Sequence, residues 1–346
     1  MMDLLHTLNK TNKEIEQFVY LFEECNLNCS FCWQDHGSKL GQDAIFDRIS
    51  DIFNTIKKYP NQPHQINIMG GELFHDGISD ALFEEYFRMV SAVYLHAQVV
   101  SVPISFTFVT NLVFEKIDRV LNLIDRLSVM GVQVALTTSY DPVGRFNAVN
   151  RKIFFTNLNY IMETAPSTIS NVSVVMTKPN ISYLLSKEDE DLRWIYSHFN
   201  LYFDYYSPNQ SANFHTPKES ELLEFFRWAA KEYPNAGPFT TWSKNTVNTT
   251  SCRRSEIIGP NGNQGRCCSL LDNFPKHDKK LIPIFNITNN NDLEAFYMNQ
   301  KGCMSCEYLS KCTMGCFLIH THELCNDMGS ECIYKIIFKE HPEWPI

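Results

Sequence analysis

Six short apolar runs alternate with longer segments of helical periodicity, and this alternation constrains the fold more than any other feature of the chain. The runs, rich in β-branched and aromatic residues, cover residues 17–22, 64–69, 104–109, 132–136, 172–176 and 201–206. Apolar positions recur with helical spacing at 44–56, 81–94, 117–127 and 192–199, and again after an expected N-cap at Thr216. Strands that alternate with helices are typical of parallel sheets, because crossover helices connect parallel neighbours. The pattern predicts an α/β fold, a partial (β/α)6 TIM-like barrel.

Composition excludes several classes of protein. The 346 residues are 44% hydrophobic and 13% aromatic, enough for a large core, and the formal net charge of −9 argues against a surface that follows nucleic-acid phosphates. No window approaches the roughly 18 uninterrupted apolar residues of a membrane span, and the polar N-terminus lacks the apolar segment of a signal peptide. We therefore expect a cytoplasmic protein with no nucleic-acid and no membrane partner.

The cysteines are concentrated at the two ends of the chain. Of twelve, three precede residue 33 and nine lie between Cys252 and Cys332. In a reducing compartment such clusters indicate metal binding rather than disulfides. We expect a short extension (1–16), a barrel (17–235) and a small cysteine-rich C-terminal domain (236–346).

The first cluster, Cys25, Cys29 and Cys32, follows the first predicted strand with the spacing CxxxCxxC. Three thiolates hold only three irons of a four-iron cluster and leave one iron for a small molecule, whereas a structural zinc ion wants a fourth protein ligand. This motif resembles that of the radical S-adenosylmethionine (radical SAM) superfamily. The resemblance implies a [4Fe–4S] cluster that binds S-adenosyl-L-methionine (SAM) and cleaves it reductively to a 5′-deoxyadenosyl radical.

Further motifs follow the other predicted strands. Gly70, Gly71 and Glu72 look like the family's GGE motif, in which glycines admit a ligand and the carboxylate receives the methionine ammonium group. Thr110 and Asn111, after the third strand, are expected to bind the ribose.

The resemblance also assigns roles at the remaining strand ends. Phe31 occupies the aromatic position that packs on the adenine, and Thr177 is expected near the adenosine. Ser139 and Asp141 resemble the Ser-x-Asp-Gly segment of relatives with auxiliary clusters, although Pro142 replaces the glycine. Asp141 and Tyr205 are the candidate catalytic residues, and packing explains Tyr205 equally well.

The C-terminal cysteines match the seven-cysteine SPASM motif, C-x(9–15)-G-x4-C, gap, C-x2-C-x5-C-x3-C, gap, C. The matching residues are Cys252, Gly262, Cys267, Cys303, Cys306, Cys312, Cys316 and Cys332. The resemblance implies two auxiliary [4Fe–4S] clusters, three clusters in all. A pair of structural zinc knuckles would share the C-x2-C element but would not explain Gly262.

By the same resemblance, one set of four cysteines would hold the distal auxiliary cluster: Cys303, Cys306, Cys312 and Cys332. Cys252, Cys267 and Cys316 would hold the cluster nearer the barrel. The fourth ligand of that cluster is open: it is Cys268, Cys325 or a substrate, and Cys325 also rivals Cys332. His320 lies in an HxH pair that is expected on an exposed helix face.

These features predict an enzyme that takes a hydrogen atom from a peptide or protein and oxidises or cross-links it, as maturases of ribosomally made peptides do. The alternatives are modification of a small molecule (a nucleoside, sugar or amino acid), sulfatase-type formylglycine formation and, from another class, a non-catalytic iron–sulfur electron carrier. A reductant such as flavodoxin or ferredoxin is implied. Only 16 residues precede the first predicted strand, too few for a leader-peptide recognition domain. We therefore expect a peptide to be recognised by the barrel mouth, by the SPASM domain or by a separate leader-peptide-binding partner.

Overall fold

A mostly parallel sheet forms the centre of the protein. The computed structural model describes residues 14–32, 34, 36–39, 41–206, 212–243, 255–265, 290–309, 312, 315–316, 319–320 and 325–344. Eight strands lie in the order β6-β5-β4-β3-β2-β1-β7-β8. Six of them pair in parallel and in chain order: β1 (Ile15–Tyr20), β2 (His64–Met69), β3 (Ile104–Val109), β4 (Val134–Ser139), β5 (Ile169–Met176) and β6 (Leu201–Tyr205). Their carboxyl ends therefore share one edge of the sheet.

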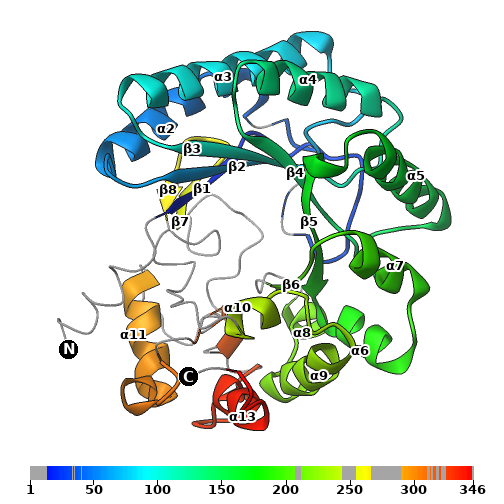
Figure 1. Ribbon diagram of the computed structural model, residues 1–346, viewed down its shortest axis with the longest axis vertical. Coiled ribbons are helices and arrows are strands. Elements are labelled where there is room, and N and C mark those ends of the chain that lie inside the picture. Colours follow the sequence, from blue (N-terminus) through cyan, green and yellow to red (C-terminus); the bar gives the residue numbers. More distant parts are fainter. Residues whose placement is uncertain are drawn as a thin grey trace.

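Helices follow the outer side of this curved sheet, as Figure 1 shows for α2, α3, α4 and α5. The helices are α2 (Asp47–Lys58), α3 (Asp80–Val99), α4 (Ile117–Val129), α5 (Ala148–Thr164), α6 (Lys178–Ser186), α7 (Glu190–His198), α8 (Ala212–His215), α9 (Glu219–Glu232), α10 (Phe239–Ser243), α11 (Asn290–Gln300) and α13 (Ile333–Glu340). Short 3-10 turns are η1 (Gln42–Ala44), η2 (Pro166–Thr168) and η6 (Cys303–Ser305). None of the described helices is both long and apolar enough to cross a membrane.

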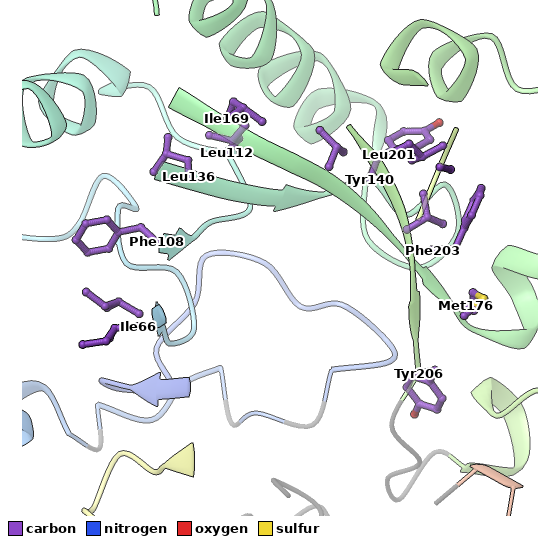
Figure 2. Packing of buried hydrophobic residues seen from close by; sticks show 14 of the residues in the cluster. Ile66, Phe108, Leu112, Leu136, Tyr140, Ile169, Met176, Leu201, Phe203 and Tyr206 are labelled. Atoms are coloured by element: carbon purple, nitrogen blue, oxygen red, sulfur yellow. The ribbon is translucent and has the colours of Figure 1, made fainter. Parts of the chain in front are cut away.

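The main core lies between the sheet and these helices. Phe108 of β3 packs on Tyr86 of α3 with ring centroids 6.5 Å apart, and Phe203 of β6 packs on Phe225 of α9 at 5.1 Å. Figure 2 shows Phe108 and Phe203 among the buried apolar side chains of successive strands. Because side chains alternate along a strand, the opposite face lines the inside of the barrel, and there Gln65 hydrogen-bonds Thr107 at 3.5 Å.

The six predicted strands and their parallel order are confirmed, with shifted bounds: β1 begins two residues and β5 three residues earlier than predicted, and β4 begins later. β4 begins two residues later than the predicted 132–136. The reason is that the residues before it still belong to the end of α4. Gly131 has a left-handed φ of +85°, and the Val132 amide donates to the Leu127 carbonyl at 3.1 Å.

Two local predictions were wrong. Lys218, not Thr216, precedes the first turn of α9, because its amide donates to Glu221 Oε2 at 2.8 Å. His320 is completely buried rather than exposed.

Two strands from the cysteine-rich region extend the barrel sheet, which sequence reasoning missed. β7 (Ser255–Ile258) pairs in parallel with β1, and β8 (Gln264–Gly265) returns antiparallel to β7. Gly262 makes the turn between them with φ +83°, and a Cβ there would lie 2.9 Å from Arg48. This accounts physically for the glycine of the SPASM-like motif.

Candidate functional site

The three N-terminal cysteines lie in the loop after β1, at the carboxyl edge of the sheet. The Leu27 amide donates to Cys25 Sγ at 3.4 Å, and the Cys32 amide donates to the Cys29 carbonyl at 3.1 Å. Burial, together with the charges of Glu72, Cys29 and Cys32, raises the pKa of Cys25 to about 12, although the Leu27 amide lowers it. Such thiols stay protonated at neutral pH unless a bound metal ion displaces their protons.

The glycines after β2 let the chain pass close to the segment that enters this loop. The Gly71 amide donates to the Phe22 carbonyl and the Glu72 amide to the Glu24 carbonyl, both at 2.9 Å. A Cβ on Gly71 would lie 2.0 Å from the Glu24 oxygen, a distance no side chain tolerates. The close approach expected of these glycines is therefore made to the backbone just before Cys25.

Glu72 joins the ends of β2 and β3. Its Oε1 accepts hydrogen bonds from the Phe74 amide at 3.0 Å and the Thr110 hydroxyl at 2.8 Å, and its Oε2 accepts from the Asn111 amide at 2.5 Å. Burial raises the pKa of Glu72 to about 7, although these donors lower it. Each carboxylate oxygen has two lone pairs, so Oε2 retains one for a further donor such as an ammonium group.

Asn111 connects the cysteine loop to this carboxylate. Its Nδ2 donates to Asn26 Oδ1 at 2.8 Å and lies 3.8 Å from Cys25 Sγ, while its backbone amide contacts Glu72. Leu112, the next residue, has a left-handed φ of +56°, and Asn157 of α5 donates to its carbonyl at 3.0 Å. A strained conformation of this kind persists only where surrounding contacts hold it.

Asp141 is bound on both oxygens. Arg145 Nε donates to Oδ2 at 2.6 Å, while the Val175 amide and Asn180 Nδ2 donate to Oδ1 at 2.8 and 3.1 Å. Burial raises the pKa of Asp141 and Arg145 lowers it. Because three donors already bind its two oxygens, Asp141 is suited to positioning Arg145. A catalytic role for Asp141 stays a prediction, and these contacts do not favour it.

Arg145 is a site residue that sequence reasoning missed. Burial raises the pKa of Cys29, and the Arg145 charge opposes that rise. The guanidinium carbon lies 5.5 Å from the centroid of Phe31, which is buried and also contacts the ring of His215 at 6.2 Å. In the sequence, the spacing of Asp141 and Arg145 at i,i+4 indicated an ion pair, but it did not indicate that Arg145 would lie next to the cysteines.

The other predicted cofactor residues have structural partners. Ser139 ends β4 and pairs with Ser173 of β5. Thr177 is buried and caps α6, since its hydroxyl accepts from the Asn180 amide at 3.3 Å. Their contacts with a nucleoside stay predictions.

Tyr205, at the end of β6, faces the C-terminal region. The Tyr334 hydroxyl donates to the Tyr205 hydroxyl at 2.8 Å, and burial raises the pKa of Tyr205 well above its ordinary value. A phenol with such a raised pKa stays protonated at neutral pH and is a poor general base. The catalytic role of Tyr205 stays a prediction.

Four C-terminal cysteines line one cavity: Cys303, Cys306, Cys312 and Cys332. They are the four assigned to the distal cluster in the sequence. Burial, with neighbouring Cys332 and Cys306, raises the pKa of Cys303 to about 12, although Lys301 lowers it. The geometry thus favours Cys332 over Cys325 for this set, because Cys325 is not among the residues that line the cavity.

The donor set of the cavity consists of thiols. In the described part of the chain, no group of three or more His, Cys, Asp or Glu side chains is arranged to hold a single metal ion. Four thiolates are the donor set of a [4Fe–4S] cluster, which carries each of them on a separate iron.

Cys325 lies on the barrel side of this region. It is completely buried, burial raises its pKa, and Cys316 raises that pKa further. Its carbonyl accepts from the Glu219 amide at 2.8 Å. Cys252, Cys267 and Cys268 lie outside the described residues, so Cys325 is the candidate fourth ligand that the structure brings toward Cys316.

We expect Cys325→Ala to lower the iron content, or to convert one cluster to a three-iron form, because losing a true ligand disrupts its cluster. Cys268→Ala, made singly, is the matched variant and should leave the iron content and the EPR spectrum unchanged. If neither variant changes them, the nearer cluster has an open iron. If both do, each cysteine is a ligand and the distal set needs revision.

Comparison with known proteins gives structural similarity alone. No family model and no curated protein sequence matches this chain. Among solved structures, His6-tagged anSMEcpe with bound AdoMet matches with a TM-score of 0.59 and 14% identity, over 96% of each chain. Streptococcus suis SuiB bound to S-adenosylmethionine matches with a TM-score of 0.53 and 15% identity, over 91% of this chain and 74% of that one.

SuiB bound to its precursor peptide SuiA matches with a TM-score of 0.52 and 14% identity, over 93% of this chain and 78% of that one. At such identity the likeness concerns the fold, and it extends through both the barrel and the C-terminal region. The fold expected from the sequence motifs is therefore confirmed. The chain has the fold of anSMEcpe and SuiB, both of which were solved with bound S-adenosylmethionine.

Proposed function

We propose that this protein is a radical SAM enzyme that takes a hydrogen atom from a peptide or protein substrate and thereby starts an oxidative modification or cross-link. The observation that carries the proposal is the position of Asn111, which contacts both Cys25 of the CxxxCxxC loop and Glu72 of the GGE motif. Two motifs separated along the chain thus form one site at the carboxyl edge of the sheet, where barrel enzymes place their chemistry.

When bound, a [4Fe–4S] cluster and SAM would supply the one-electron cleavage that yields the 5′-deoxyadenosyl radical. Cys25, Cys29 and Cys32 would hold the cluster through three thiolates. Glu72 would accept the ammonium group of SAM at the free lone pair of Oε2. Arg145, held by Asp141, offsets the negative charge that the thiolates bring into a buried site.

A peptide substrate is supported by the similarity to SuiB, whose solved structure contains the precursor peptide SuiA. Loss of a hydrogen atom leaves a substrate radical. A two-electron oxidation then requires the departure of one more electron and one proton. The four-cysteine cavity, beside Tyr334 and within reach of the barrel through Tyr205, suits an auxiliary cluster that accepts this electron. Flavodoxin or ferredoxin would supply the first electron.

We expect roughly 12 iron and 12 sulfide per chain after anaerobic reconstitution, four for each of the three cysteine sets. With dithionite, the reconstituted protein should convert SAM to 5′-deoxyadenosine. Iron and sulfide analysis and chromatography of the nucleoside measure both. A zinc-only preparation that stays folded and active would contradict the proposal.

A further inference from the structure

A buried ion pair links the barrel to the wall of the four-cysteine cavity. Lys301 Nζ lies 2.7 Å from Glu219 Oε2, and the two side chains are 0% and 1% exposed. Glu219 is the first residue of α9, whereas Lys301 directly follows α11 and lines the cavity. Because both charges are removed from water, their fields act on the cavity with little screening.

Lys301 also holds the segment that leads to Cys332. Its ammonium donates to Asn326 Oδ1 at 3.0 Å, to the Gly329 carbonyl at 2.8 Å and to the Glu331 carbonyl at 2.9 Å. With Glu219 it therefore has four acceptors, and its position is fixed. A fixed cation at this wall is a permanent part of the environment of the four cysteines.

The second oxygen of Glu219 reaches the same wall by another route. Glu219 Oε1 hydrogen-bonds His320 Nδ1 at 2.9 Å, and His320 Nε2 hydrogen-bonds the Tyr334 hydroxyl at 2.6 Å. Tyr334 lines the cavity as Lys301 does, whereas Glu219 does not. One carboxylate of the barrel thus positions two residues of the cavity wall.

We infer that Lys301 and Glu219 set the reduction potential of the group bound in the four-cysteine cavity, with Lys301 making its reduction easier and Glu219 opposing it. This rests on the proposed function, in which a [4Fe–4S] cluster occupies the cavity. A bound cluster would take one electron, from the substrate radical in the proposed reaction or from dithionite in a titration, and would gain one negative charge; no bond forms or breaks. An ammonium group at the wall stabilises that charge, and a more distant carboxylate destabilises it less strongly.

The test compares two variants whose effects should have opposite signs. Glu219→Gln keeps the shape of the side chain and removes only the negative charge, so the midpoint potential should rise. Lys301→Met combined with Glu219→Gln removes both charges without leaving either unpaired, and the potential should fall because the nearer cation is lost. Each change should alter the equilibrium constant for reduction about tenfold, which is about 59 mV for one electron.

The measurement is an EPR-monitored redox titration of the reconstituted full chain in a background with Cys25, Cys29 and Cys32 changed to Ala. The signal that disappears with Cys306→Ala belongs to the cavity. Lys335→Met is the matched control: Lys335 lines the same cavity but is partly exposed, so its removal should change the potential much less.

Opposite shifts in the two variants support the inference. Shifts in the same direction, or changes no larger than that of Lys335→Met, overturn it while leaving the cluster and the proposed function intact. If Cys306→Ala removes neither iron nor an EPR signal, no cluster occupies the cavity, and that part of the proposed function fails together with the inference.

Discussion

Replacing Cys25, Cys29 and Cys32 together by Ala is expected to abolish reductive cleavage of SAM. The three thiolates are the ligands assigned to the cluster that binds SAM, and no other cysteine precedes Cys252. The auxiliary sets are separate, so roughly 8 of the roughly 12 irons should remain. Chromatography for 5′-deoxyadenosine, with iron analysis of the same sample, measures both effects.

The matched control changes three cysteines of the distal cavity, Cys303, Cys306 and Cys312, to Ala. This variant should lose roughly four irons as well, yet it should still release 5′-deoxyadenosine in the presence of dithionite. The contrast separates a specific loss of radical formation from a general loss of iron. If the N-terminal triple variant still forms 5′-deoxyadenosine, the radical-generating cluster has been placed wrongly.

The sheet and the order of the motifs could be predicted because both are local properties of the chain. A strand followed by a helix shows its period within a few residues, and a motif after each strand must lie at the carboxyl edge of a parallel sheet. The sequence therefore predicted that Cys25, Glu72 and Asn111 would come together. β7 and β8 were missed because they are short and have no helix between them.

The contacts that hold the site could not be predicted, because they join polar side chains and backbone groups that are far apart in the chain. Asn157 and Leu112 are 45 residues apart, and Lys301 and Glu219 are 82 apart. Hydrophobic periodicity shows which face of an element is buried, but not which polar side chains meet within it. His320 illustrates this limit: its place in an HxH pair indicated a surface, yet Glu219 and Tyr334 satisfy both its ring nitrogens in the core.

Glu72→Ala is expected to lower both the stability of the protein and its affinity for SAM. The change leaves the donors of Phe74, Thr110 and Asn111 unpaired in the core, and each such group costs about 1–3 kcal/mol. The free energy of unfolding should therefore fall by about 3 kcal/mol or more, a large share of the 5–15 kcal/mol typical of a domain. Denaturant titration measures this loss, and equilibrium binding to the reconstituted protein measures the affinity.

Glu72→Gln separates the two effects and adds a pH dependence. Gln preserves the volume and the acceptor for Phe74 and Thr110, so it should cost less stability than Ala. Because the pKa of Glu72 is raised to about 7, ionisation opposes folding, and its contribution to stability is lost as pH rises from about 4.3 toward 7. An ammonium ligand needs the ionised form. SAM affinity should therefore increase between pH 6 and 8 in the parent protein and stay flat in Glu72→Gln, whereas equal profiles in the two proteins would mean that Glu72 does not receive the ammonium group.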